Sequence, residues 1–271
     1  MIKIDEKIKN NYLDKASPYR SVCDLILNEE QKLLTLINQN PETSASERFK
    51  LSESMLNLIS NYLIIDGLSQ SILNIKNDDA LNSARKAIYK SIIYLEEVVT
   101  NLIDVPFTYY EKKLAVIENI DPFQRYHLVR KMGLSIQLLK NAYGDNSKWK
   151  WNFVEIEGRF AAVAKNLINL RTVISDIEPS SVYYEPVILH LGLVKNLLMQ
   201  TAERYREMYE VSTKRVDDFI QAITFLNTLR RFNMLTGCML EAANNKKKLD
   251  IWNQKLESDM GKDKKHSGSK T

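Results

Sequence analysis

Cysteine is scarce in this chain of 271 residues, which contains only Cys23 and Cys238. Two cysteines cannot supply the disulfide framework that stabilises small secreted proteins. Both stand among apolar neighbours, as free cysteines of a protein core do. We therefore expect reduced core side chains in a cytoplasmic protein.

Long apolar runs are missing as well. The longest, from Val187 to Val194, includes His190 and Gly192 and is far shorter than the roughly 20 residues that cross a bilayer. The first fifteen residues are charged throughout and lack the apolar stretch of a signal peptide. We expect neither a membrane span nor export.

Glycine and histidine are too sparse and too scattered for the common catalytic motifs. The eight glycines form no phosphate-binding loop and no nucleophile elbow. The histidines at 127, 190 and 266 belong to no Glu-x-x-His pair of the kind that di-iron helical bundles use. We expect no metal, no cofactor, no small-molecule substrate and no enzymatic activity.

One enzyme class suits a helical chain, namely prenyl-diphosphate chemistry on aspartate-rich helix segments that hold magnesium. Two segments offer paired aspartates: Asp78-Asp79 with Asn82, and Asp217-Asp218 with Gln221. Each lacks a third carboxylate one turn later. Aspartates at these places are explained equally well by helix capping and by the favourable helix dipole.

The net charge of +4 is confined to the end of the chain. Residues 246–271 contain eight lysines and four acidic residues, and the remaining body has 30 basic and 30 acidic residues. Nucleic-acid binders usually carry a broad basic surface. We expect residues 260–271, which have few apolar side chains, to form a disordered basic tail.

What the chain does contain is helical periodicity. Between residues 153 and 177, apolar residues recur at alternating steps of three and four. This seam of the coiled-coil type predicts one helix over 147–177. Four further apolar residues widen the seam, which favours a bundle with several neighbours over a two-stranded coiled coil. The seam comprises Phe153, Ile156, Phe160, Val163, Leu167, Leu170, Ile174 and Ile177, and the further residues are Val154, Ala161, Ala164 and Ile168.

Similar stripes and the six prolines divide the rest of the chain. Pro18 and Pro122 each follow a residue that can cap a helix, so we place both at a first helical position. The helices expected are 18–40, 44–76, 79–103, 106–120, 121–143, 147–177, 183–210 and 212–244. The predicted fold is all-α, an elongated bundle or irregular stack of about eight mostly long antiparallel helices. Residues 1–259 should form one domain, with a possible subdivision near 105–121.

Residues 128–140 resemble a helix-turn-helix, with Gly133 at the turn. Val129 stands where the motif needs a small residue, and Ile136 and Leu138 would face the bases. A continuous helix through Gly133 is the better interpretation. Nucleic-acid binding through residues 128–151 and the basic C-terminal tail remains the alternative function.

Our leading functional hypothesis is a non-enzymatic scaffold or adaptor that binds a protein partner, either itself or another protein. Basic and aromatic residues alternate just before Phe153, and the segment 219–240 is apolar on nearly every side. Such residues are frequent anchors for a partner. The candidate partner-binding surface consists of Lys148, Trp149, Lys150, Trp151, Phe225 and Phe232.

Overall fold

The computed structural model describes residues 5–40, 44–144 and 147–267, the last six of these by backbone only. All regular elements in these ranges are helical, which confirms the predicted all-α fold. The helices are α1 (Glu6–Gln39), α2 (Ala45–Leu73), α3 (Asp78–Val98), α4 (Phe107–Val116), α5 (Pro122–Tyr143), α6 (Asn152–Asn166), α7 (Val173–Asp176), α8 (Tyr184–Met208), the π-helical turn η2 (Tyr209–Thr213), α9 (Val216–Leu235) and α10 (Met239–Ser267).

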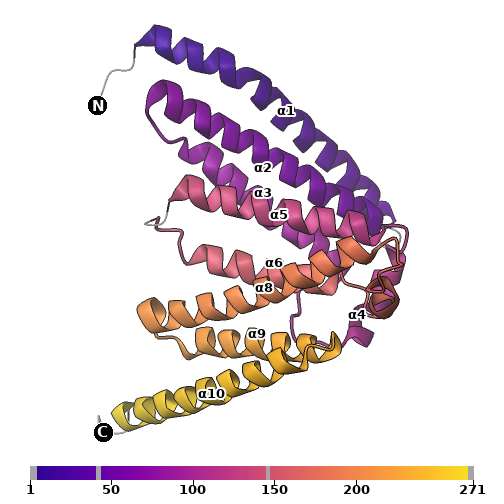
Figure 1. Cartoon of the computed structure of the whole chain (residues 1–271). Helices are drawn as coiled ribbons and strands as arrows, with labels where there is room; N and C mark the ends of the chain where they lie inside the picture. Colours follow the sequence, from indigo (N-terminus) through magenta and orange to yellow (C-terminus); the bar gives the residue numbers. More distant parts are fainter. Residues whose placement is uncertain (1–4, 41–43, 145–146, 268–271) are drawn as a thin grey trace.

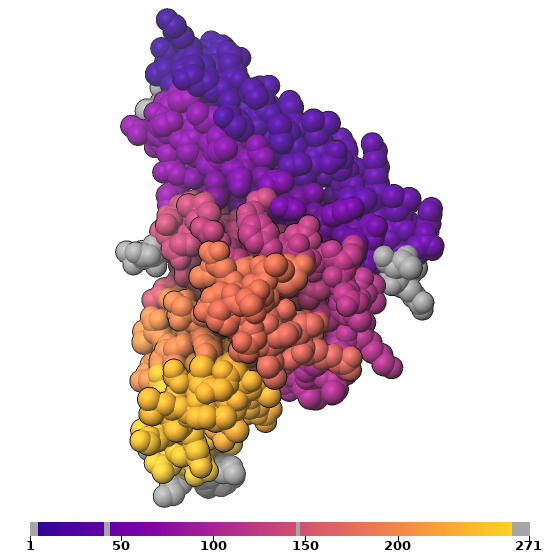
Figure 2. All heavy atoms as spheres, turned by 45° about the vertical axis from the view of Figure 1, so that its right-hand side comes forward, coloured from indigo at the N-terminus to yellow at the C-terminus, as the bar shows by residue number. Residues whose placement is uncertain are grey.

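The long helices form an elongated, irregular stack in sequence order (Figure 1). They splay apart at the side where both chain ends lie and converge at the other side, where α4 lies at the edge. Figure 2 shows the same order along the long axis, from α1 at one end to α10 at the other. In the middle of the stack, α6 packs against α3, α5 and α8.

Helix α1 begins earlier than the sequence suggests and includes Pro18 in its interior. The expectation that Pro18 opens a helix is therefore wrong. A proline inside a helix removes one hydrogen bond to the carbonyl four residues earlier, here that of Asp14. Both residues are exposed, so water can satisfy the freed carbonyl. Helix α1 therefore extends on both sides of Pro18.

Helix α5 runs without interruption through Gly133. Asp121 caps its start and Pro122 takes the first helical position, as expected, and the structure adds a capping box, in which the side chains of Asp121 and Gln124 each accept a hydrogen bond from the other's backbone amide. Val129 and Ile136 are both buried on one face. The continuous helix leaves no turn at Gly133, so the resemblance to a helix-turn-helix does not extend to the structure.

The helix expected over 147–177 is interrupted. α6 ends at Asn166, a short irregular segment follows, and α7 contains only four residues. The seam is buried as far as Leu167, whereas Ile174 is 69% exposed. Side-chain hydrogen bonds compete with the helix here. The side-chain oxygen of Asn169 accepts a hydrogen bond from the backbone amide of Arg171, in place of a helical bond to a backbone carbonyl.

The helix expected over 212–244 is also divided. α9 ends at Leu235 and α10 begins at Met239, with Gly237 between them at φ +76°. Glycine adopts this left-handed conformation without a steric cost, so it ends helices readily. The apolar character of 219–240 therefore belongs to one buried helix and an exposed corner that follows it.

Helix α10 continues to Ser267, and it buries Leu249 and Trp252 against the end of the stack. The tail expected from residue 260 thus starts within helix, while residues 268–271 lie outside the described residues. Buried apolar side chains from α1 through α10 form one contiguous core. That continuity is compatible with the expected single domain, and α4, near the expected subdivision, contributes Leu114 to the same core.

Candidate functional site

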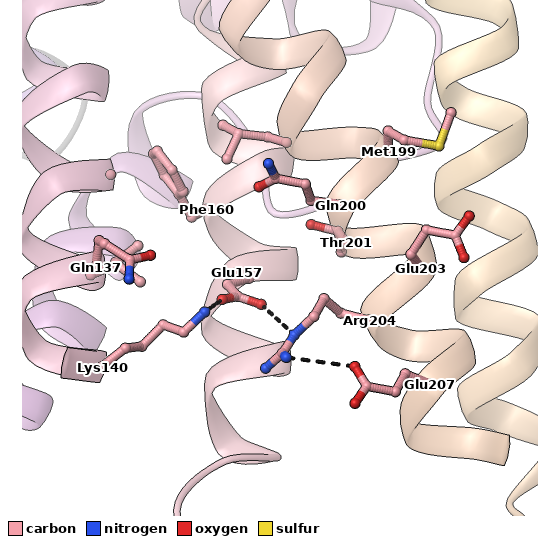
Figure 3. A pocket seen from close by; sticks show the side chains of 13 residues that line it. Gln137, Lys140, Glu157, Phe160, Met199, Gln200, Thr201, Glu203, Arg204 and Glu207 are labelled. Carbon is pink, nitrogen blue, oxygen red and sulfur yellow. Dashed lines mark hydrogen bonds and ion pairs between the residues drawn. The ribbon is translucent and has the colours of Figure 1, made fainter. Parts of the chain in front are cut away.

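A groove of about 560 Å³ opens in the middle of the stack, between α5 and α8 and above α6 (Figure 3). Because α5 and α8 lie on either side of the shorter α6, side chains of all three helices line it. Its volume falls within the range of ligand-binding clefts. We take it as the candidate functional site.

One half of the groove is apolar. Ile136 of α5 and Phe160 of α6 are buried at its base, and Leu197 of α8 is half-buried beside them. Phe160 lies close to Gly133, where an added Cβ would stand 3.4 Å from the ring. Gly133 thus permits a close approach of α5 to α6, which is a packing role.

The other half is charged. Glu157 of α6 lies between Lys140 of α5 and Arg204 of α8, and Arg204 also approaches Glu207 (Figure 3). The Arg204–Glu157 and Arg204–Glu207 contacts measure 3.4 and 3.6 Å, and Lys150 approaches Glu207 at 3.2 Å. These five side chains form a network of alternating charges that joins the three walls.

The position of α6 beneath the groove depends on a close contact with α8 and α9. A Cβ at Gly158 would lie 3.1 Å from Tyr205 and 3.3 Å from Phe225. Those two rings stack with centroids 5.7 Å apart. A side chain at Gly158 would require the rings of Tyr205 and Phe225 to shift by a few tenths of an ångström, so this glycine serves close helix packing.

The structure separates the candidate surface residues predicted from the sequence. Trp149 is half-buried against the core, with the Arg85 guanidinium 4.0 Å from its ring centroid. Lys148 is exposed, and its amine lies 5.3 Å from the same ring. A tryptophan with two cations near its ring is held in place by contacts within its own chain.

Lys150 and Trp151 lie near the charged half of the groove. The Lys150 amine is 4.6 Å from the half-buried ring of Trp151 and also belongs to the ionic network through Glu207. Lys150 is therefore the predicted surface residue that the fold brings to the groove.

Phe225 and Phe232 do not lie on a surface. They are 4% and 3% exposed, because the buried face of α9 packs on α8 and α10. The apolar pattern of this segment reflects core packing, and these two rings do not form an exposed docking surface.

The paired aspartates occupy helix starts. Asp78 and Asp79 lie in the first turn of α3, and Asp217 and Asp218 lie in the first turn of α9. Carboxylates there favour the helix dipole. Within the described residues, no three His, Cys, Asp or Glu side chains are grouped to hold a metal ion.

Sequence reasoning did not find the groove. Its ion pairs join α5, α6 and α8, and no short motif spans them. Glu157, for example, pairs with residues 17 positions before it and 47 positions after it. The alternation of basic and aromatic residues over Lys148–Trp151 was the one sequence signal near the groove, because Lys150 joins its ionic network.

Comparison with known protein families gives a match. The model of the TP0443 family matches residues 8–260. No curated protein and no solved structure matches the chain. Among the described helices, none is both long and apolar enough to cross a membrane.

Proposed function

The chain belongs to the TP0443 family, and we propose that it is a non-enzymatic scaffold that binds an amphipathic segment of a partner protein in the groove between α5 and α8. The observation that supports this most is the groove's composition. An apolar half beside a charged half suits a helical segment that has one apolar face and a charged flank.

The ionic network gives such a groove rigid walls. Lys140, Glu157 and Arg204 each come from a different helix and hold one another. A preformed groove loses less conformational entropy on binding than a mobile one does. Salt bridges of this partial exposure contribute little stability individually, so we assign the network to shape and recognition.

A cytoplasmic location is part of the proposal. Cys23 and Cys238 are both free, and Cys23 is buried. Burial raises the pKa of the Cys23 thiol to about 11, which keeps it in the unreactive thiol form. Unpaired cysteines of this kind suit a reducing compartment.

A bulky side chain at the groove wall should prevent partner binding. Gln137 is exposed on α5 and lines the groove, so Gln137→Trp fills the space without disturbing the core. We expect the amount of specific partner recovered in affinity purification to fall by about tenfold, while the free energy of unfolding changes by no more than about 0.5 kcal/mol.

The matched control is Gln31→Trp, at an exposed position on α1 far from the groove. It adds the same side chain to the surface, and the recovered partner should equal that of the unsubstituted protein. Equal recovery with Gln137→Trp and Gln31→Trp would rule out the groove as the binding site.

A further inference from the structure

A second cavity, of about 350 Å³, lies at the opposite end of α6 from the ionic network. It is open to solvent and is lined by the segment before α4, by α4 itself, by the end of α6 and by the end of α9. Most of its lining is apolar, including Val105, Phe107 and Phe232. Met234 and Leu235, which are 45% and 64% exposed, also line it.

Lys165 lines this cavity and is only 8% exposed. Within the described part of the chain, its amine has no hydrogen-bond or ion-pair partner, and the interaction found is with the Tyr110 ring, whose centroid is 5.3 Å away. Burial lowers the pKa of Lys165 to about 8. A buried ammonium without a partner is costly, and native proteins rarely retain one without a use.

Two hydroxyl groups on side chains that line the same cavity are also unsatisfied. The Tyr110 hydroxyl and the Thr228 hydroxyl are buried and have no hydrogen-bond partner. These two unsatisfied hydroxyls, from α4 and α9, and the Lys165 side chain of α6 therefore meet around one apolar cavity. Each can donate a hydrogen bond, so together they suit an acceptor.

The charge of that acceptor follows from the other ionic groups at the cavity. Asp104 and Arg231 pair with each other at 2.5 Å, so they neutralise one another. Asp104 opposes the fall of the Lys165 pKa without forming an ion pair with it. The cavity is left with one uncompensated cation, which matches a ligand with a single negative charge.

We propose that this cavity is a binding site for an amphipathic monocarboxylate, whose carboxylate pairs with Lys165 and whose apolar body lies against Val105, Phe107 and Phe232. The site is about the size of small-ligand pockets. It does not depend on the groove between α5 and α8, and its test involves no protein partner.

The test is calorimetric titration of the full chain with octanoate. We expect saturable one-to-one binding, with acetate and octan-1-ol each at least about tenfold weaker because one lacks the apolar body and the other lacks the charge. Absence of octanoate binding, or equal binding of octan-1-ol, would overturn the proposal.

Lys165→Met keeps the length and apolar stem of the side chain and removes the charge. We expect octanoate affinity to fall by about tenfold or more, with no loss of melting temperature because an unpaired buried charge has been removed. Lys86→Met, at an exposed position on α3, is the control and should bind octanoate as the unsubstituted protein does. Equal affinities of the Lys165→Met and Lys86→Met proteins would contradict the assignment.

The pH dependence provides a readout that does not require a variant. The other titratable or charged side chains that line the cavity with Lys165 are Tyr110 from α4, Asp104 from the preceding segment and Arg231 from α9. Burial raises the pKa of Tyr110, so that phenol stays neutral. Octanoate affinity should be nearly constant up to about pH 7, about twofold weaker at pH 8 and about tenfold weaker by pH 9, as the amine loses its proton. An affinity that does not change between pH 7 and pH 9 would contradict pairing with Lys165.

Discussion

Replacing Arg125 with leucine should lower the free energy of unfolding by about 3 to 5 kcal/mol. Arg125 is 6% exposed and lies one turn into α5. Its guanidinium donates to the carbonyl of Ile120 at 2.7 Å, to that of Ile117 at 2.8 Å and to that of Leu167 at 3.5 Å. It thereby joins the segment after α4, α5 and the end of α6.

The size of the effect follows from what the substitution leaves behind. Leucine fills part of the space but donates no hydrogen bond, so buried carbonyls lose their donor, each at a cost of about 1 to 3 kcal/mol. Burial lowers the pKa of Arg125, and the nearby Asp121 and Glu118 oppose that shift. The guanidinium is thus held by carbonyl dipoles and by two acidic neighbours.

Chemical denaturation of two variants measures this effect. Arg130→Leu changes an exposed arginine of the same helix and should alter the free energy of unfolding by no more than about 0.5 kcal/mol. If Arg125→Leu lowered the free energy of unfolding by no more than Arg130→Leu does, the three hydrogen bonds of Arg125 would contribute little to the stability of the fold.

Acidification from pH 6.5 to pH 4 should remove about 3 kcal/mol of stability through His190 alone. His190 of α8 is 4% exposed, and its Nε2 donates to the carbonyl of Ala164 at 3.0 Å. Burial lowers its pKa to about 4, and the positive charge of Arg125 acts in the same direction.

The sign follows from the proton balance between the two states. Below pH 6.5 the unfolded chain takes up a proton on this histidine, while the folded chain does not until about pH 4. The contribution of neutral His190 to the free energy of unfolding is therefore present above pH 6.5 and is lost as the pH falls towards 4.

Substitution of the histidine isolates its contribution from that of the carboxylates. His190→Gln can still donate to Ala164 but does not titrate, so its stability should fall about 3 kcal/mol less than that of the unsubstituted chain over this range. His127→Gln, at an exposed position on α5, is the matched control. If the free energy of unfolding fell equally with pH in the His190→Gln and unsubstituted proteins, the claim that His190 is buried in its neutral form would be refuted.

The regular parts of this fold could be predicted because burial and periodicity agree in them. The stripe of α5 and the first half of the seam from Phe153 have the spacing of a buried helix face, and both are buried. A seam of apolar residues, however, does not report where a helix ends. After Asn166 the chain leaves the helix, and the side-chain amide of Asn166 donates to the backbone carbonyls of Thr100 and Leu102.

The candidate groove and the second cavity were harder to predict for the same reason. Glu157 joins residues of three helices, and Lys165 becomes notable only because its neighbours provide no partner. Both properties arise from tertiary contacts, and a lysine or glutamate on a helix has no distinctive pattern in sequence. The apolar residues of α9 were conspicuous, yet Phe225 and Phe232 turned out to be core.

The central claim, that the groove between α5 and α8 holds a partner segment, is tested most directly by site-specific photo-crosslinking in the native cell. A photoreactive residue at Gln200, which is exposed on α8 and lines the groove, should give one dominant covalent protein adduct. The same residue at Gln31 on α1 should not give it, and Gln137→Trp should abolish it. The same adducts from both positions, or an adduct at Gln200 that persists with Gln137→Trp, would contradict the claim.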